Sequence, residues 1–152
     1  MTATFLFVLN NYNDVDQTAP LIYELLGEQH RVIVTSNGQY NLNSDIRIND
    51  LRNFPKFSVI TFYILKILNR NPSILTKGFR TLLFNKYLAT LLLMMWRVDL
   101  CLFTWCNPYR KGFQTNLLRA ATLLNVPNIC LPHGQNIFTN FAVNQHLKDF
   151  FE

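Results

Sequence analysis

The residue best suited to chemistry in this chain is His133, which lies in the tripeptide Pro132-His133-Gly134. An apolar run over residues 129–131 precedes it and predicts a short buried strand. Ligands of open α/β sheets bind at the carboxyl edge of the strands, where this turn would lie. Because imidazole changes protonation near neutral pH, His133 is a candidate general base. A structural histidine hydrogen-bonded to a neighbouring strand would leave the same local sequence.

Polar residues also follow or precede other predicted elements. Asn10 and Asn11 follow the apolar run over residues 4–9, whereas Arg110 and Lys111 stand before a predicted helix, where anions are favoured. If the strand ends converge, these residues form one substrate-binding edge, together with the residues after His133: Gly134, Gln135 and Asn136. Ordinary turns also use Asn and Gly, and an Arg-Lys pair is often simply solvated.

Several common site types are absent from the sequence. No Gly-x-Gly-x-x-Gly follows the first apolar run, and there is no Walker-type Gly-Lys-Ser/Thr, which argues against dinucleotide and P-loop enzymes. The three cysteines are Cys101, Cys106 and Cys130, whose spacing suits neither a disulfide framework nor a metal site. A Cys106 nucleophile beside His133 is a remaining alternative. We expect no metal and no bound cofactor.

The positive charge is concentrated in the middle of the chain. Residues 52–119 hold eleven of the fourteen basic residues and one acid, a net charge of +10, whereas the remainder sums to −5. Within residues 56–97 the cations alternate with aromatic residues, a mixture that suits anionic lipid headgroups or nucleic acid. The solvated face of amphipathic helices would look the same.

Alternating strands and helices are predicted in the first third of the chain. Residues 4–9 form a nearly continuous apolar run, as expected for a central strand covered on both faces. Thr18 is a candidate helix cap, with Ala19, Ile22 and Leu26 facing the core and Gly27 ending the helix. A β-branched strand over residues 31–35 then completes a right-handed β-α-β unit.

The rest of the chain continues the alternation. In chain order we predict a short third strand over 45–48, a loop over 49–55, a helix over 57–68, a longer helix from 73 or 76 to 97, a strand over 99–104, a loop over 105–111, a helix from 112 or 113 to 124, and the strand that leads to His133. In the last helix, Leu117, Ala121 and Leu124 should face inward. The predicted fold is a single doubly wound, mostly parallel Rossmann-like α/β domain over residues 1–152, with a basic helical insertion over 56–97 between strands three and four.

Three segments carry a resemblance to a known family: FLFVL at residues 5–9, QHRVIVT at 29–35 and VPNICLPHG at 126–134. Together they resemble the amino-terminal half of GT-B glycosyltransferases, and most closely the CDP-glycerol glycerophosphotransferases and related surface-polysaccharide enzymes. The resemblance implies that His133 lies in a cleft between two Rossmann-like domains and acts as the base toward the acceptor hydroxyl. It also implies a nucleotide-sugar or CDP-polyol donor as substrate, a lipid-linked acceptor, and a second domain or partner chain that holds most of the donor.

Two further expectations concern location and alternative functions. Without a secretory signal, and with apolar stretches too short to cross a bilayer, we expect a cytoplasmic protein that lies on the inner membrane face through residues 56–97. The alternatives are a non-catalytic α/β module that docks a partner enzyme to anionic membrane, and a nucleic-acid-binding protein. The latter rests on the basic balance alone, and we expect no nucleic-acid partner.

Overall fold

The computed structural model describes residues 2–63, 65, 85–104 and 112–131. Its centre is a five-stranded, all-parallel sheet with the strand order β3-β2-β1-β4-β5. The strands are β1 Thr4–Val8, β2 Arg31–Ser36, β3 Phe57–Thr61, β4 Leu100–Phe103 and β5 Asn128–Cys130. The helices are α1 Tyr12–Gly27, the 3₁₀ turn η1 Leu42–Ser44, α2 Ile46–Leu51, α5 Lys86–Trp96 and α6 Phe113–Leu123.

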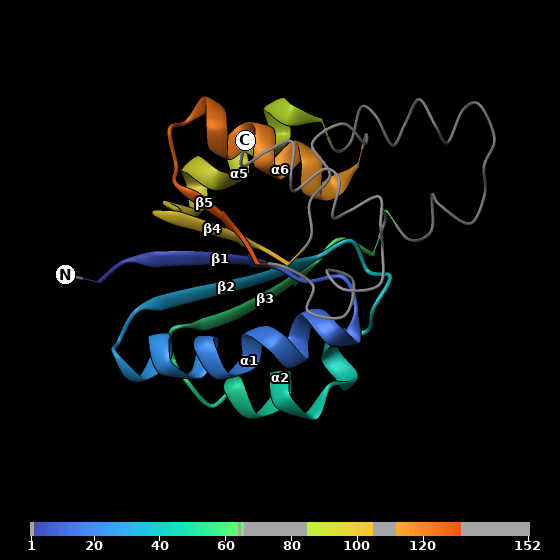
Figure 1. Ribbon diagram of the computed structural model, residues 1–152, viewed down its shortest axis with the longest axis vertical. Coiled ribbons are helices and arrows are strands. Elements are labelled where there is room, and N and C mark those ends of the chain that lie inside the picture. Colours follow the sequence, from blue (N-terminus) through green and yellow to red (C-terminus); the bar gives the residue numbers. More distant parts are fainter. Residues whose placement is uncertain (1, 64, 66–84, 105–111, 132–152) are drawn as a thin grey trace, which may run out of the picture.

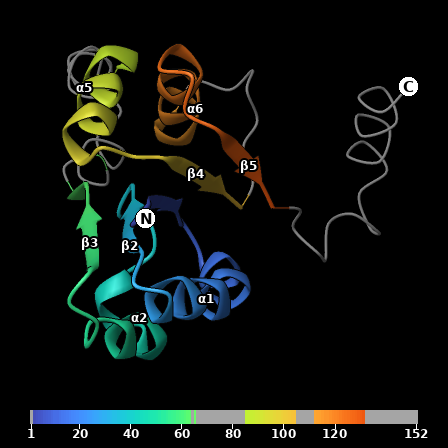
Figure 2. The ribbon, with the colours of Figure 1, turned by 90° about the vertical axis from the view of Figure 1, so that its left-hand side faces the viewer.

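The helices cover both faces of the sheet. Figure 1 shows α1 and α2 below the sheet and α5 and α6 above it, and Figure 2 shows β3 and β5 at its two edges. The doubly wound α/β fold predicted from the sequence is therefore confirmed for the described residues. The prediction that β1 is the central strand is confirmed as well. The proposal that residues 1–152 form one domain stays a prediction.

Alternate residues along β1, and Leu9 directly after it, pack into two hydrophobic cores, one on each face of the sheet. Leu6 and Val8 pack with the residues of α5 and α6, whereas Phe7 and Leu9 pack with those of α1 and α2. All of them are fully buried. Because successive side chains of a strand point to opposite faces, a continuous apolar run is what a strand with helices on both sides requires.

Helix α1 begins six residues before the predicted cap. Its N-cap is Asn11, and Thr18 lies buried inside the helix, where its Oγ1 donates a hydrogen bond to the Asp14 carbonyl at 2.7 Å. Pro20 also lies inside the helix. The predicted inward positions Ile22 and Leu26 are confirmed, because both are buried. The helix starts earlier than predicted because Asn11 and Asp14 form a two-way cap at its amino end.

The prediction was also wrong for residues 45–51 and 57–61. Residues 45–48, predicted as a strand, contain the N-cap Asp45 and the first turn of α2, and the helix continues to Leu51 inside the predicted loop. The true third strand is β3, within the segment predicted as a helix. β3 pairs along its whole length with β2, so the sheet selects the extended form of its β-branched sequence.

This correction also changes the basic insertion. Because β3 begins at Phe57, the segment over 56–97 is not helical throughout. Between β3 and β4 the described helix is α5, which Asn85 caps by accepting hydrogen bonds from the backbone N–H groups of Tyr87 and Leu88. Residues 66–84, which were predicted to be helical in large part, lie outside the described residues.

For the described residues from β4 to β5, the structure agrees better with the prediction. Strand β4 and helix α6 lie where they were predicted, and Leu117 and Ala121 are buried in the core, with Leu124 packed against it. The predicted buried character of the last strand was wrong, however. β5 is an outer strand that pairs with β4 alone among the described strands, and its three residues are all exposed.

Candidate functional site

The sheet order places three strand exits side by side. β1, β4 and β5 are neighbours, with Val8 opposite Phe103 and Phe103 opposite Cys130. The Leu131 N–H continues this pairing, since it donates a hydrogen bond to the Phe103 carbonyl at 2.7 Å. The predicted convergence of these three strand ends on one edge is therefore confirmed, and the ligand-binding edge of an open parallel sheet is the same carboxyl edge.

Most of the predicted site residues lie outside the described residues. They are Arg110 and Lys111, which directly precede the α6 N-cap Gly112, and the four residues His133, Gly134, Gln135 and Asn136, which begin two positions after Leu131. Their assignment to the site stays a prediction. The structure does describe the strands and helix to which both segments are attached.

The turn between β1 and α1 is closed by a reciprocal cap. The Asn11 Oδ1 accepts a hydrogen bond from the Asp14 N–H at 3.0 Å. In return, Asp14 Oδ2 accepts the N–H groups of Asn10 at 2.7 Å and Asn11 at 3.2 Å. Only 1% of Asp14 is exposed. The amino end of α1 therefore already has a carboxylate.

This cap decides what can bind after β1. Dinucleotide folds place a phosphate at the amino end of the first helix, where backbone N–H groups and the helix dipole favour an anion. Here Asp14 occupies that role and would repel a second anion. At the start of α6, by contrast, Gly112 has no side chain to cap the helix. Of these two helix starts beside the edge, the one after β4 is better suited to a phosphate.

Asn10 and Asn11 make hydrogen bonds within the fold that the sequence did not predict. The Asn10 Oδ1 accepts a hydrogen bond from the Asn37 N–H at 3.4 Å, which joins the ends of β1 and β2. The Asn11 oxygen is used in the helix cap. A ligand at these residues can use their side-chain NH₂ donors, and each oxygen, which already accepts one hydrogen bond, has a second lone pair.

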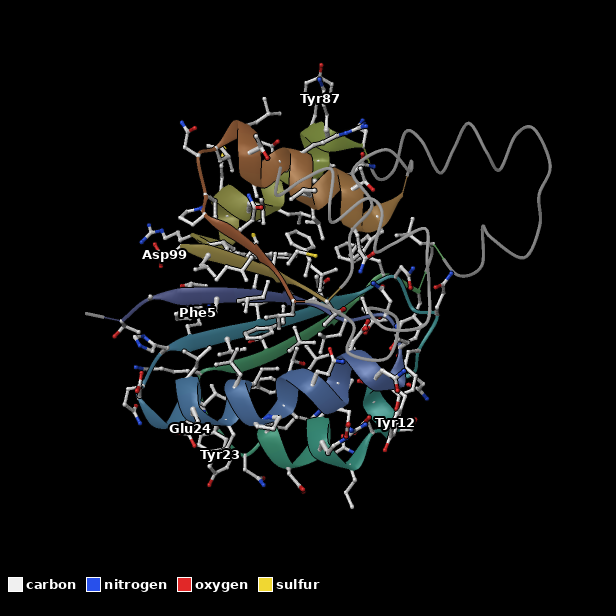
Figure 3. All side chains as sticks on the ribbon, in the orientation of Figure 1. Phe5, Tyr12, Tyr23, Glu24, Tyr87 and Asp99 are labelled. Carbon is white, nitrogen blue, oxygen red and sulfur yellow. The ribbon has the colours of Figure 1, made fainter. Side chains whose placement is uncertain are left out.

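A second polar cluster lies at the same edge, below the end of β1. Its centre is Arg47, whose Nε and Nη2 donate to the two oxygens of Asp45 at 3.0 and 2.7 Å. Arg47 Nη1 also donates to Asp16 at 2.8 Å, and its Cζ lies 4.3 Å from the centre of the Tyr12 ring. Figure 3 shows Tyr12 at the end of α1 that lies at the carboxyl edge of the sheet. The cluster ties α1 to α2.

The ionisation of this cluster follows from its contacts. The hydrogen bonds from Arg47 lower the pKa of Asp45 to about 2, against the opposing effect of burial. In turn, Asp45 raises the pKa of the Arg47 guanidinium. Burial, followed by the hydrogen bond that the hydroxyl donates to Asp45 at 2.7 Å, raises the pKa of Tyr40. At neutral pH none of the three groups changes its protonation state. The cluster is therefore suited to a structural role and not to proton transfer.

We predict that Arg47→Met lowers the free energy of unfolding by about 2–3 kcal/mol at pH 7, because it leaves the Asp45 carboxylate, 6% exposed, without its cation. The pairing stabilises the fold above the ordinary Asp pKa of 3.8 and is lost as the pH falls through about 2. Urea unfolding measures the difference in the free energy of unfolding between the unaltered protein and Arg47→Met. This difference should be constant from pH 7 to about pH 4 and should shrink between about pH 4 and about pH 2. Arg52→Met, at an exposed residue, is the control, and a difference that persists at pH 2 would contradict the prediction.

Two buried hydroxyls stand at strand ends of this edge. Within the described part of the chain, the Oγ1 atoms of Thr61, at the end of β3, and Thr104, just after β4, are buried without a hydrogen-bond partner. Thr104 is 1% exposed. A buried hydroxyl left without a partner costs about 1–3 kcal/mol, so such groups mark places where a further partner is expected.

The two described cysteines lie in different surroundings, and the buried one does not suit catalysis. Cys101 is buried, and burial raises the pKa of its thiol to about 12, so it stays protonated. Cys130 is exposed on β5. Cys106, the candidate nucleophile, lies outside the described residues. Within residues 2–63, 65, 85–104 and 112–131, no three His, Cys, Asp or Glu side chains are grouped so that they could hold a metal ion.

The sequence prediction overlooked the residues that organise this edge: Tyr12, Asp14, Tyr40, Asp45 and Arg47. A signal existed for Asp14, because Asn11-x-x-Asp14 is the spacing of a capping box. None existed for the contact between Tyr12 and Arg47, which are separated by a helix and a strand.

No protein-family model matches the chain, and no curated protein matches it.

Proposed function

We propose that this chain is the acceptor-side domain of a transferase that moves a glycosyl or polyol-phosphate group. The donor is a nucleotide-sugar or a CDP-polyol, and the acceptor is a membrane-linked surface-polysaccharide chain. The proposal joins the GT-B resemblance of residues 126–134 to the position of the strand that precedes His133. In this proposal, a second Rossmann-like domain or a partner chain holds most of the donor.

The observation that supports it most is the carboxyl edge formed by β1, β4 and β5. The exits of β4 and β5 lead directly into the two predicted active segments, one with Arg110 and Lys111 and the other with His133. The amino end of α1 is closed by Asp14, which disfavours a dinucleotide at the usual place. The buried Thr104 hydroxyl adds a polar group with no described partner at the β4 exit. A reaction centre over β4 and β5 fits these features best.

The proposed reaction needs a base and a positive charge. The His133 imidazole accepts the proton of the acceptor hydroxyl while the acceptor oxygen bonds to the anomeric carbon or the phosphorus of the donor. The bond from that atom to the leaving phosphate oxygen breaks, and the nucleotide departs with the bonding electrons. Arg110 and Lys111, which directly precede the α6 N-cap Gly112, neutralise its charge.

The remaining predicted residues bind and orient the substrates. Gly134 allows the backbone to approach the acceptor closely, while Gln135 and Asn136 offer amide groups for its hydroxyls. Asn10 and Asn11 border the same edge, from the end of β1. Each of their oxygens already accepts one hydrogen bond within the fold, and their NH₂ groups can donate to a substrate.

The test is acceptor-dependent release of nucleotide. The full-length protein, or this chain with the chain that supplies its second domain, is incubated with nucleotide-sugars or CDP-polyols and a lipid-linked polyol or glycan acceptor. We expect the free nucleotide to form only when both substrates are present. A full-length protein that has neither a second α/β domain nor a partner chain that supplies one, or an intact two-domain assembly that transfers from no such donor, would refute the proposal.

A second candidate function is supported by a different observation. Helix α5 exposes large apolar side chains, as expected for a non-catalytic module that docks a partner enzyme to anionic membrane. Such a module would retain membrane binding in the full-length protein but would show no transfer with any donor.

A further inference from the structure

Helix α5 is apolar on both sides. Its inner side packs on the sheet through Ala89 and Leu93, which are buried. Its outer side exposes Tyr87 at 69%, Leu91 at 52%, Met94 at 59% and Met95 at 67%. These four residues, the α5 patch, are spaced i, i+4, i+7 and i+8 and therefore lie on one face. A helix that is apolar all round is normally covered on all sides.

The outer side of α1 provides the contrast within the same fold. It exposes charged and polar groups, among them Asp16, Gln17 and Glu24. Figure 3 shows Glu24 on the outer side of α1 and Tyr87 pointing away from the sheet on the opposite side of the molecule. α1 also exposes Leu21 and Tyr23, but these lie among charged and polar residues, whereas α5 carries its four exposed apolar residues without any acidic residue.

The charged residues at the two ends of α5 are positive. Lys86 and Arg97, at the two ends of the helix, are both exposed, and α5 contains no acidic residue. The Lys86 Nζ lies 5.0 Å from the centre of the Tyr87 ring. The patch belongs to the segment over residues 52–119, whose net charge is +10. An apolar face flanked by cations complements an anionic lipid surface, because the side chains enter the interface and the cations remain at the headgroups.

We propose that the α5 patch docks this domain on an anionic lipid bilayer, with the helix lying parallel to the membrane surface. The inference rests on the proposed function, since it names the surface that brings the domain to a lipid-linked acceptor. The region expected to contact the membrane is thereby reduced from the whole basic segment over 56–97 to one face of α5. Tyr87 suits this position because its ring is apolar and its hydroxyl can remain in contact with water.

The size of the patch favours a lipid surface over other occupants. A standard protein interface uses about 20–30 residues on each side, whereas the patch has four. The 11 residues of α5 extend about 16 Å, against a hydrocarbon core of about 30 Å. Among the helices of the described residues, none is long and apolar enough to cross a membrane. A shallow contact at the interface is what this helix can make.

The test is vesicle sedimentation of the protein with phosphatidylcholine vesicles, with and without roughly one third phosphatidylglycerol. We expect binding to the anionic vesicles only, weakened by high salt. The triple variant Leu91→Gln, Met94→Gln, Met95→Gln should bind at least about tenfold more weakly. The pair Lys86→Gln, Arg97→Asn should lose roughly 10–30-fold. The control is Leu21→Gln on α1, at a residue that is 39% exposed.

Circular dichroism and thermal unfolding confirm that the variants fold, which is expected because every altered side chain is exposed. The inference is overturned by equal binding to neutral and anionic vesicles, by no binding, or by a triple variant that binds like the unaltered protein. A dimer that depends on these residues, seen by light scattering without vesicle binding, would assign the patch to a second copy instead. His133→Gln should bind vesicles normally, so loss of transfer with intact binding would separate the two proposals.

Discussion

Replacing His133 by Gln in the full-length protein should lower kcat for transfer by about 100-fold to 10,000-fold, with a much smaller effect on KM. The reason is that His133 follows the strand that pairs with β4 at the carboxyl edge, and the acceptor hydroxyl needs a base there. In the unaltered protein the rate should fall as the pH drops below the ordinary His pKa of about 6.5. The variant should lose this dependence. Steady-state kinetics from about pH 5 to pH 9 measure both effects.

His30 offers a matched control at the opposite edge of the sheet. Its Nδ1 accepts a hydrogen bond from the Ala3 N–H at 3.2 Å, just before the start of β1. Because it lies at the amino edge, His30→Gln should leave kcat and its pH profile unchanged. If His133→Gln stayed within about threefold of the unaltered rate, His133 would be a structural residue and not the base.

Phe7→Ala should lower the free energy of unfolding by about 3–5 kcal/mol. Phe7 is fully buried in β1, where its strand is hydrogen-bonded to β2 on one side and to β4 on the other. Truncation leaves a cavity between the sheet and α1, in a core too closely packed to collapse around it. Since domains of this size are stable by only about 5–15 kcal/mol, the melting temperature should fall by roughly 10–15 °C.

Urea unfolding monitored by circular dichroism measures this loss, with Leu21→Ala as the control. Leu21 lies on the outer side of α1, 39% exposed, so its truncation should change the free energy by less than about 0.5 kcal/mol. Similar losses for the two variants would mean that Phe7 does not occupy the core that the structure assigns to it.

The parts of the fold that the sequence predicted well are those with a strong local pattern. β1 and β4 are nearly continuous apolar runs, β2 is centred on the β-branched residues 32–34, and α6 repeats its apolar residues with helical spacing. A strand buried on both faces shows a continuous apolar run, and a helix buried along one stripe shows apolar residues with helical spacing. Either pattern can be recognised from the local sequence alone. Their neighbours along the chain then determine the β-α-β connection, because parallel strands require a crossover.

The errors occurred where local signals compete. Asp45 and Ile48 alternate polar and apolar like a strand, but Asp45 caps α2 by accepting a hydrogen bond from the Arg47 N–H at 3.0 Å. Phe57–Thr61 has the length and composition of either element, and its pairing with β2 made it a strand. At Asp45 the deciding hydrogen bond is a local helix cap two residues away, whereas at Phe57–Thr61 it is the pairing with a distant strand. The apolar period reports neither of them.

The candidate site divides in the same way. By itself, the sequence determined which residues follow the strands, and hence that Asn10, Thr104 and His133 come directly after or near strand ends. Only the tertiary structure decided that β1, β4 and β5 are neighbours, that Asp14 closes the start of α1, and that Arg47 reaches Asp16 and Tyr12. Local order depends on backbone preferences and periodic burial. Strand adjacency and the pairing of distant charges depend on contacts that exist only once the sheet has assembled.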